Sequence, residues 1–282
     1  RFHERVERRT HRIDWLGGAL LTLGSASLIL ALLEGGHAWA WDSPQSIAAF
    51  AAGVLLVGGF VAVETRAPEP VLPLWVLSRR LLATTALIAV GVGILLMGVT
   101  TYVPTFLESL VGVSPLVSGL SLAAMTLGWP ISASQAGRVY LRIGFRATVV
   151  LGAVVTVGAG ALLAVTSTTP SVVLVATSCF VMGLGLGFVA APSLIAAQSS
   201  VGWGDRGVVT GANMFARSMG SAVGIAALGA LVNAQMRGAD PFAEPERFNA
   251  AATTAFTAVA VVGVLTLVAA LAMPRGDRPQ QG

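Results

Sequence analysis

The chain has 282 residues, of which 55% are hydrophobic and only 11% are charged, and its 17 basic and 13 acidic side chains leave a net charge of +4. A soluble domain typically carries about 25% charged residues, so this composition excludes an ordinary soluble globular protein. All basic residues are arginines, and they occur in short segments between long apolar runs, which excludes a nucleic-acid-binding surface. A transmembrane barrel needs alternating segments of about ten residues, so the predicted fold class is an all-α membrane protein.

Eight apolar runs are long enough to cross about 30 Å of hydrocarbon as helices. They span residues 14–33, 46–64, 82–104, 116–136, 147–167, 172–194, 207–232 and 251–272. Short connections link most of them, as expected for antiparallel neighbours.

The arginines predict how these spans are oriented. If residue 1 lies in the cytoplasm, fourteen arginines fall in cytoplasmic segments, two in outside segments and one inside a span. Cytoplasmic loops of membrane proteins are enriched in basic residues. We therefore expect a multi-pass protein of the cell membrane with both ends in the cytoplasm.

The segment 65–81 separates two groups of spans and contains three prolines. Proline removes a backbone donor and interrupts helices, so we expect a cytoplasmic linker here. It divides a helical pair, 14–64, from a six-helix unit, 82–272. The basic segment 1–13 is either a solvated linker or an amphipathic helix on anionic lipid, and 273–282 form a cytoplasmic tail.

The run 207–232 combines a charge with small residues. Arg217 lies inside it and Asn213 lies one helical turn earlier, while Gly220 and Gly224 repeat at an interval of four. An arginine in hydrocarbon costs at least ~2.5–3.5 kcal/mol, so we expect its side chain to face protein or water. The glycines predict a close helix crossing, as do Gly183 and Gly187 in another span.

Polar residues divide the six spans of 82–272 into two classes. In the runs 147–167 and 251–272 the polar side chains are only threonines and one terminal serine, which suits lipid-facing helices. The other four hold interior candidates, among them Thr101, Gln135, Asn213 and Arg217. Hydrogen bonding within the helix bundle is the alternative role for each of these side chains.

Residues typical of enzymes and metal sites are missing. The chain has no Gly-x-Ser-x-Gly, His-Glu-x-x-His or Walker A motif, its three histidines lie outside the spans, and Cys179 is its single cysteine. No acidic residue lies in the central part of a span. We therefore expect neither an enzyme nor a cofactor or metal site.

The segment GRVYLRIGFR between two spans resembles the cytoplasmic-loop signature of the major facilitator superfamily. Gly137, Arg142, Gly144 and Arg146 match the pattern, and Leu141 stands where the pattern has aspartate. The glycines permit a tight turn, and the arginines, with Arg138, can bind helix C-terminal carbonyls or carboxylates. Plain positive charge on the cytoplasmic side is the alternative role.

Other stretches are similar to the fourteen-helix drug:proton antiporters of the EmrB/QacA type. They include IDWLGGALLTLGSASLILALLEGG, ETRAPEPVLPLWVLSRR, SPLVSGLSLAAMTLGWPISASQAGR and GVVTGANMFARSMGSAVGIAALGALV. The resemblance implies an exporter of small amphipathic substrates in the lipid bilayer, driven by a proton gradient. It also implies that 14–64 are a two-helix central insert and that 82–272 are the C-terminal six-helix transporter domain. The first six helices, with the acids that carry protons, would then be missing from this chain.

On this resemblance, four spans form one wall of a substrate cavity, with Met97, Tyr102 and Met125 as an adaptable apolar surface. Arg217 either sets the polarity of that cavity or locks a neighbouring helix. Two other functions remain open at this stage: an exporter of one metabolite or lipid on the same fold, and a truncated membrane scaffold that does not transport.

Overall fold

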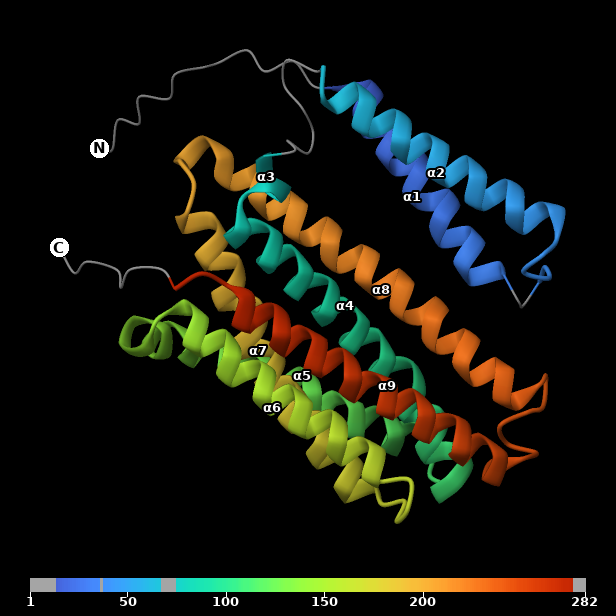
Figure 1. Cartoon of the computed structure of the whole chain (residues 1–282). Coiled ribbons are helices and arrows are strands. Elements are labelled where there is room, and N and C mark those ends of the chain that lie inside the picture. The colour runs from blue at the N-terminus through green and yellow to red at the C-terminus, as the bar shows by residue number, and fades with distance from the viewer. Residues whose placement is uncertain (1–13, 36–37, 67–74, 276–282) are drawn as a thin grey trace, which may run out of the picture. The chain divides into compact units, whose positions relative to one another are not determined.

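The computed structural model of the chain describes residues 14–35, 38–66 and 75–275. Within them, eight helices are long and apolar enough to cross a membrane, which confirms the eight predicted spans and the all-α fold class (Figure 1). The predictions for segment 1–13, the three prolines of the linker and most of the tail concern residues outside the described part. The chain divides into two compact units between Trp75 and Val76.

The two-helix unit is a hairpin in which glycines bring the helices together. It consists of α1 (Trp15–Glu34) and α2 (Pro44–Glu64). Gly24 lies against the backbone of Val57, and Gly53 lies against Leu28. Because neither glycine has a side chain, the two helix backbones approach each other at both points.

The six-helix unit holds the remaining spans. Its elements are α3 (Trp75–Ser78, whose first residue belongs to the other unit), α4 (Arg80–Phe106), the π-helical turn η1 (Leu107–Val111), α5 (Pro115–Ile143), α6 (Phe145–Val165), α7 (Val172–Ser199), the 3₁₀ turn η2 (Trp203–Asp205), α8 (Arg206–Met236) and α9 (Pro245–Ala272). Large apolar side chains fill the core between these helices. Phe106 and Phe256, for example, meet edge to face with ring centroids 5.4 Å apart.

The packing of the six helices repeats after three of them. In the triplets α4–α6 and α7–α9, the first helix of each packs against the second helix of the other: α4 lies on α8, and α7 lies on α5. The third helices, α6 and α9, lie side by side (Figure 1). Internal repeats of this kind are a frequent design in transporter folds.

Glycines allow α4 and α8 to cross with their backbones in contact. A Cβ added to Gly93 would clash with the carbonyl oxygen of Arg217, and one added to Gly220 would clash with the carbonyl oxygen of Val90. Gly224 lies against α4 one turn further along. Each helix thus presents a glycine to a carbonyl of the other, so the crossing point is fixed from both sides.

The crossing of α5 and α7 is built in the same way. A Cβ on Gly183 would clash with the carbonyl oxygen of Met125, and one on Gly128 would meet the carbonyl oxygen of Phe180. Gly187 lies on α5 one turn later. The two crossings are therefore built on the same kind of reciprocal glycine contact. The sequence spacing predicted the glycines on α7 and α8 but not those on α4 and α5.

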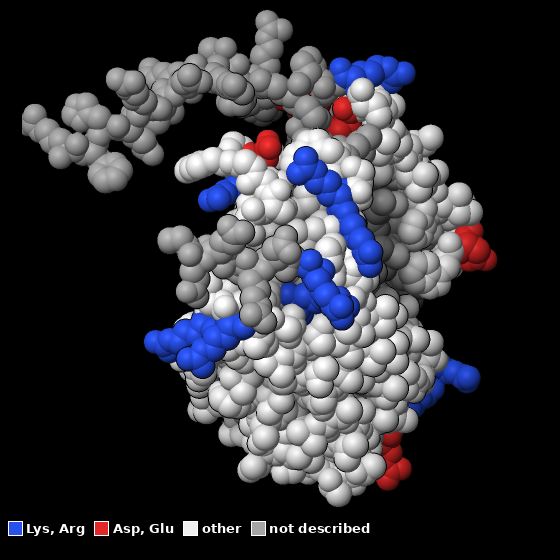
Figure 2. Space-filling model, turned by 60° about the vertical axis from the view of Figure 1, so that its left-hand side comes forward, with Lys and Arg blue, Asp and Glu red and all other residues white. Residues whose placement is uncertain are grey.

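Part of the surface of α6 and α9 is apolar, as it is on the other spans. Both expose large apolar side chains, including Leu151 and Val154 on α6 and Leu265 and Val268 on α9. Figure 2 shows wide areas of one face of the molecule without any charged side chain. Such surfaces fit hydrocarbon rather than water.

The structure differs from the sequence prediction at the end of α5. We expect a loop over 137–146, but α5 continues as a helix to Ile143, and Gly144 alone separates it from α6. Gly144 has φ 87°, a conformation that a residue with a Cβ adopts only under strain. The apolar run ends before the helix does, because a helix can continue beyond the hydrocarbon, where polar side chains are favoured.

Replacing Gly220 by alanine should destabilise the six-helix unit, because the new methyl group meets the backbone of Val90 and overpacking of this kind costs about 1–3 kcal/mol. Gly211→Ala is the matched control on the same helix, since nothing lies within 4 Å of a Cβ at that position. We expect a lower thermal unfolding midpoint in detergent for Gly220→Ala than for Gly211→Ala. Equal midpoints would contradict the close crossing.

Candidate functional site

The polar face of α8 is held on α4 by two hydrogen bonds from side chains to backbone. The amide of Asn213 donates to the carbonyl oxygen of Thr85 at 3.2 Å, and the hydroxyl of Ser221 donates to the carbonyl oxygen of Gly93 at 3.4 Å. These bonds flank the position of Arg217. Together with the glycine contacts, they fix the rotation of α8 about its own axis.

Arg217 is the charged group on this face. Its backbone carbonyl faces Gly93 of α4, and its side chain is half-buried. Among the residues that the structure describes, its guanidinium has no hydrogen-bond or ion-pair partner. A guanidinium within an apolar span is costly unless water, an anion or another helix contacts it. The arrangement thus presents an unpaired cation at a fixed position beside the α4/α8 crossing.

The other predicted cavity residues fall into two groups. On α4, Thr101 is exposed and Met97 is half-buried, whereas Tyr102 turns inward and is 8% exposed. On α5, Met125 is 3% exposed in the core against α7, and Gln135 is exposed near the end of the helix. The structure places Arg217 at the α4/α8 crossing and Met125 at the α5/α7 crossing, whereas Thr101 and Gln135 are exposed away from the glycine contacts. Lining of a cavity by this set stays a prediction.

The arginine-rich end of the six-helix unit is the end that carries Arg80, Arg138, Arg142, Arg146, Arg206 and Arg275. Arg138 donates to the side-chain oxygen of Gln135 at 2.8 Å, within α5. Gly137 lies inside α5 and forms no turn, whereas Gly144 does. Arg142 is exposed in the last turn of α5.

Two arginines bind the C-terminal carbonyls of α9. Arg146 donates to the carbonyl oxygen of Leu271 at 2.6 Å, and Nε of Arg80 donates to the carbonyl oxygen of Ala272 at 3.1 Å. The last carbonyls of a helix lack backbone partners and carry partial negative charge, so cations stabilise them. These bonds tie α9 to the starts of α6 and α4.

Sequence reasoning missed the role of Arg80. In the sequence it is one of two adjacent arginines before a span, and only its membrane side can be predicted from that. The residue that it contacts lies 192 positions away. No local pattern indicates such a contact, because it depends on how the six helices are packed.

The chain was compared with known protein families and proteins. The family model described as Major Facilitator Superfamily matches residues 6–225. Three similar curated proteins are a multidrug transporter protein, MdtP, of Bacillus subtilis (36% identical), Multidrug resistance protein 3 of the same species (29%) and a tetracycline resistance determinant of Streptomyces rimosus (32%). The alignments cover 79%, 81% and 77% of this chain, but 41%, 44% and 62% of the relatives. The chain therefore spans less than two thirds of the length of each.

Substituting Arg80 by glutamine should loosen the last turn of α9, because the carbonyl oxygen of Ala272 loses a charge-assisted hydrogen bond worth about 1.5–3 kcal/mol. Hydrogen–deuterium exchange of the peptide that covers the end of α9 measures this directly, and we expect faster exchange there. Arg142→Gln removes a charge from the same end without a bond to α9 and serves as the control. Equal exchange in the two variants would contradict the capping role.

Proposed function

This chain belongs to the major facilitator superfamily, and we propose that it forms the C-terminal part of a secondary active exporter of amphipathic drugs. The observation that carries the proposal is the unpaired Arg217, held beside the α4/α8 crossing of a six-helix unit whose helices can span a membrane. The names of the relatives, two multidrug proteins and a tetracycline resistance determinant, support drug export as the activity.

The proposed mechanism is alternating access. In such transporters one helix bundle rocks against another around a site near the middle of the membrane. Here α4, α5, α7 and α8 form one wall of that site, and α6 and α9 face lipid. The glycine contacts keep the wall rigid, because α4 and α8, like α5 and α7, touch at backbone level and cannot slide without a clash. The six-helix unit then moves as one body.

The opposite wall lies in the rest of the protein. The alignments cover 41% and 44% of the two Bacillus relatives, so more than half of each relative lies outside the matched part. In this proposal the two-helix unit is the central insert of a fourteen-helix protein. The partner of the six-helix unit is then an N-terminal bundle of six further helices.

We propose proton-driven transport, with the titrating acids in that N-terminal bundle. In the spans described here the acidic side chains lie toward helix ends, as Glu64 and Glu108 do. The arginine-rich end then faces the cytoplasm, and the protein resides in the cell membrane with both ends of this chain inside. Neither a cofactor nor nucleic acid takes part in the proposed cycle.

Expression of the full reading frame in bacteria that lack their own efflux pumps tests this function. We expect the cells to extrude a fluorescent amphipathic cation, and we expect a protonophore to abolish extrusion. Extrusion that persists after the proton gradient is collapsed would contradict proton coupling. Absence of extrusion of any amphipathic probe, with normal protein abundance in the membrane, would favour an exporter of one metabolite or lipid, or a scaffold.

Replacement of Arg217 by alanine should reduce efflux about tenfold, the effect of losing ~1.4 kcal/mol of interaction with the substrate or a facing helix. Arg206→Ala, an exposed arginine at the start of the same helix, is the matched control and should transport normally. Arg217→Lys tests whether the positive charge alone is sufficient, because lysine keeps the charge but not the planar set of donors. Unchanged efflux in Arg217→Ala at wild-type abundance would exclude both roles.

A further inference from the structure

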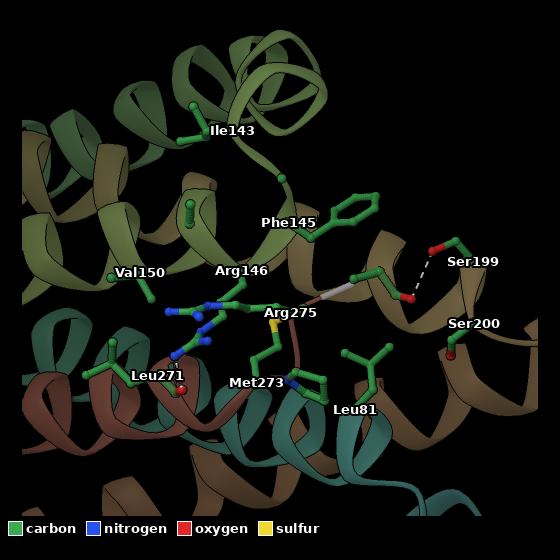
Figure 3. A pocket seen from close by; sticks show the side chains of 14 residues that line it. Leu81, Ile143, Phe145, Arg146, Val150, Ser199, Ser200, Leu271, Met273 and Arg275 are labelled. Carbon is green, nitrogen blue, oxygen red and sulfur yellow. Dashed lines mark hydrogen bonds between the residues drawn. The ribbon is translucent and has the colours of Figure 1, made fainter. Parts of the chain in front are cut away.

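A pocket of about 600 Å³ opens at the arginine-rich end of the six-helix unit, away from the polar face of α8. Its walls come from the starts of α4 and α6, the ends of α5, α7 and α9, and the residues that follow α9. Figure 3 shows Arg146, from α6, and Arg275, from the segment after α9, among the side chains that line it. The efflux mechanism proposed above does not use this pocket.

The charge of the pocket is one-sided. Arg146 uses one guanidinium nitrogen to bind Leu271, which leaves other N–H donors available, and Arg275 is exposed without a partner among the described residues. No acidic side chain is present in the described lining. Two guanidinium groups that line one pocket without a carboxylate attract an anion, and the arginine fork matches phosphate oxygens especially well.

The remaining walls are mostly apolar. Leu81, Val150, Leu271 and Met273 contribute to them. Leu271 is 48% exposed and continues along the exposed apolar face of α9, where Leu265 and Val268 lie. The pocket therefore joins a positive site to a surface that suits hydrocarbon. A ligand that fills both parts has an anionic head and an apolar tail.

We propose that this pocket binds an anionic phospholipid, with the phosphate on Arg146 and Arg275 and an acyl chain along α9. The proposal rests on the orientation given above, which places the arginine-rich end at the cytoplasmic leaflet, where anionic lipids attract basic side chains. A soluble phosphate has the same head-group chemistry but no apolar part to cover Leu271 and Val150. The bound lipid then bridges α6 and α9 at the end where Arg146 already joins them.

Native mass spectrometry of the full-length protein released from detergent tests the proposal. Phosphatidylglycerol is titrated against the wild type, and phosphatidylcholine of the same acyl chains is the uncharged comparison. We expect one phosphatidylglycerol to bind more tightly than the rest and more tightly than phosphatidylcholine. Each arginine should contribute about fivefold to that affinity, so Arg275→Gln should weaken it about fivefold and the double variant Arg146→Gln/Arg275→Gln about 25-fold.

The control is Arg142→Gln, which removes a charge from the same end of the six-helix unit without lining the pocket. Its affinity should stay within twofold of the wild type. An equal loss in the control and in Arg275→Gln would reduce the effect to general surface charge and overturn the proposal. So would equal binding of the two lipids, or displacement of phosphatidylglycerol by millimolar inorganic phosphate, which would indicate a site for a soluble anion.

Arg275→Gln guards against a folding artefact, because Arg275 is exposed and makes no hydrogen bond to the helices that the structure describes. Its thermal unfolding midpoint without added lipid should equal that of the wild type. Since lipid binding is measured without transport, the two proposals fail separately. Efflux without selective lipid binding would overturn this proposal alone, and lipid binding without efflux would overturn the proposed function alone.

Discussion

Hydrocarbon offers no hydrogen bonds to a polypeptide backbone, and the rest of this structure follows from that constraint. Every spanning segment must satisfy its own N–H and C=O groups, which an α-helix does. Once formed, apolar helices gain little from contact with one another rather than with lipid, so their association depends on close packing and a few polar contacts. The chain meets both conditions with eight helices. In the six-helix unit they pack around a core of apolar side chains, through glycine contacts and through side chain-to-backbone hydrogen bonds.

The two reciprocal glycine crossings give the six-helix unit its order. In each crossing, a glycine of either helix contacts a backbone carbonyl of the other. Both crossings join the first helix of one triplet to the second helix of the other. The third helices of the two triplets, α6 and α9, pack against each other. The α4/α8 crossing also fixes the rotation of α8, so that Arg217, next to the contact with Gly93, is held by the packing rather than by its own side chain. An unpaired charge at such a position in an apolar span costs free energy, and this cost is the physical reason to expect a functional role for Arg217.

The sequence predicts the larger features because they depend on composition along the chain. Eight apolar runs, the separation of basic segments and the glycine interval of four are local properties, and each corresponds to an observed helix, helix end or crossing. The features that could not be predicted depend on packing between distant segments. Polar residues after position 136 suggest a loop although α5 continues, and nothing near Arg80 or Arg275 in the sequence indicates a contact with α9 or a shared pocket. The burial of Met125 likewise follows from the rotation of α5, which its neighbours in sequence do not determine.

The central claim is that the six-helix unit crosses a membrane with its arginine-rich end on one side. Single cysteines at positions 142 and 237, in a Cys179→Ser background, test it with a thiol reagent that does not cross membranes. The account predicts that the cysteine at 237 reacts in intact cells and the one at 142 only in inverted vesicles, where a cysteine at 79 reacts as well. Labelling of 142 and 237 from the same side, or of 79 and 142 from opposite sides, would contradict the eight crossings and the proposed export function that depends on them.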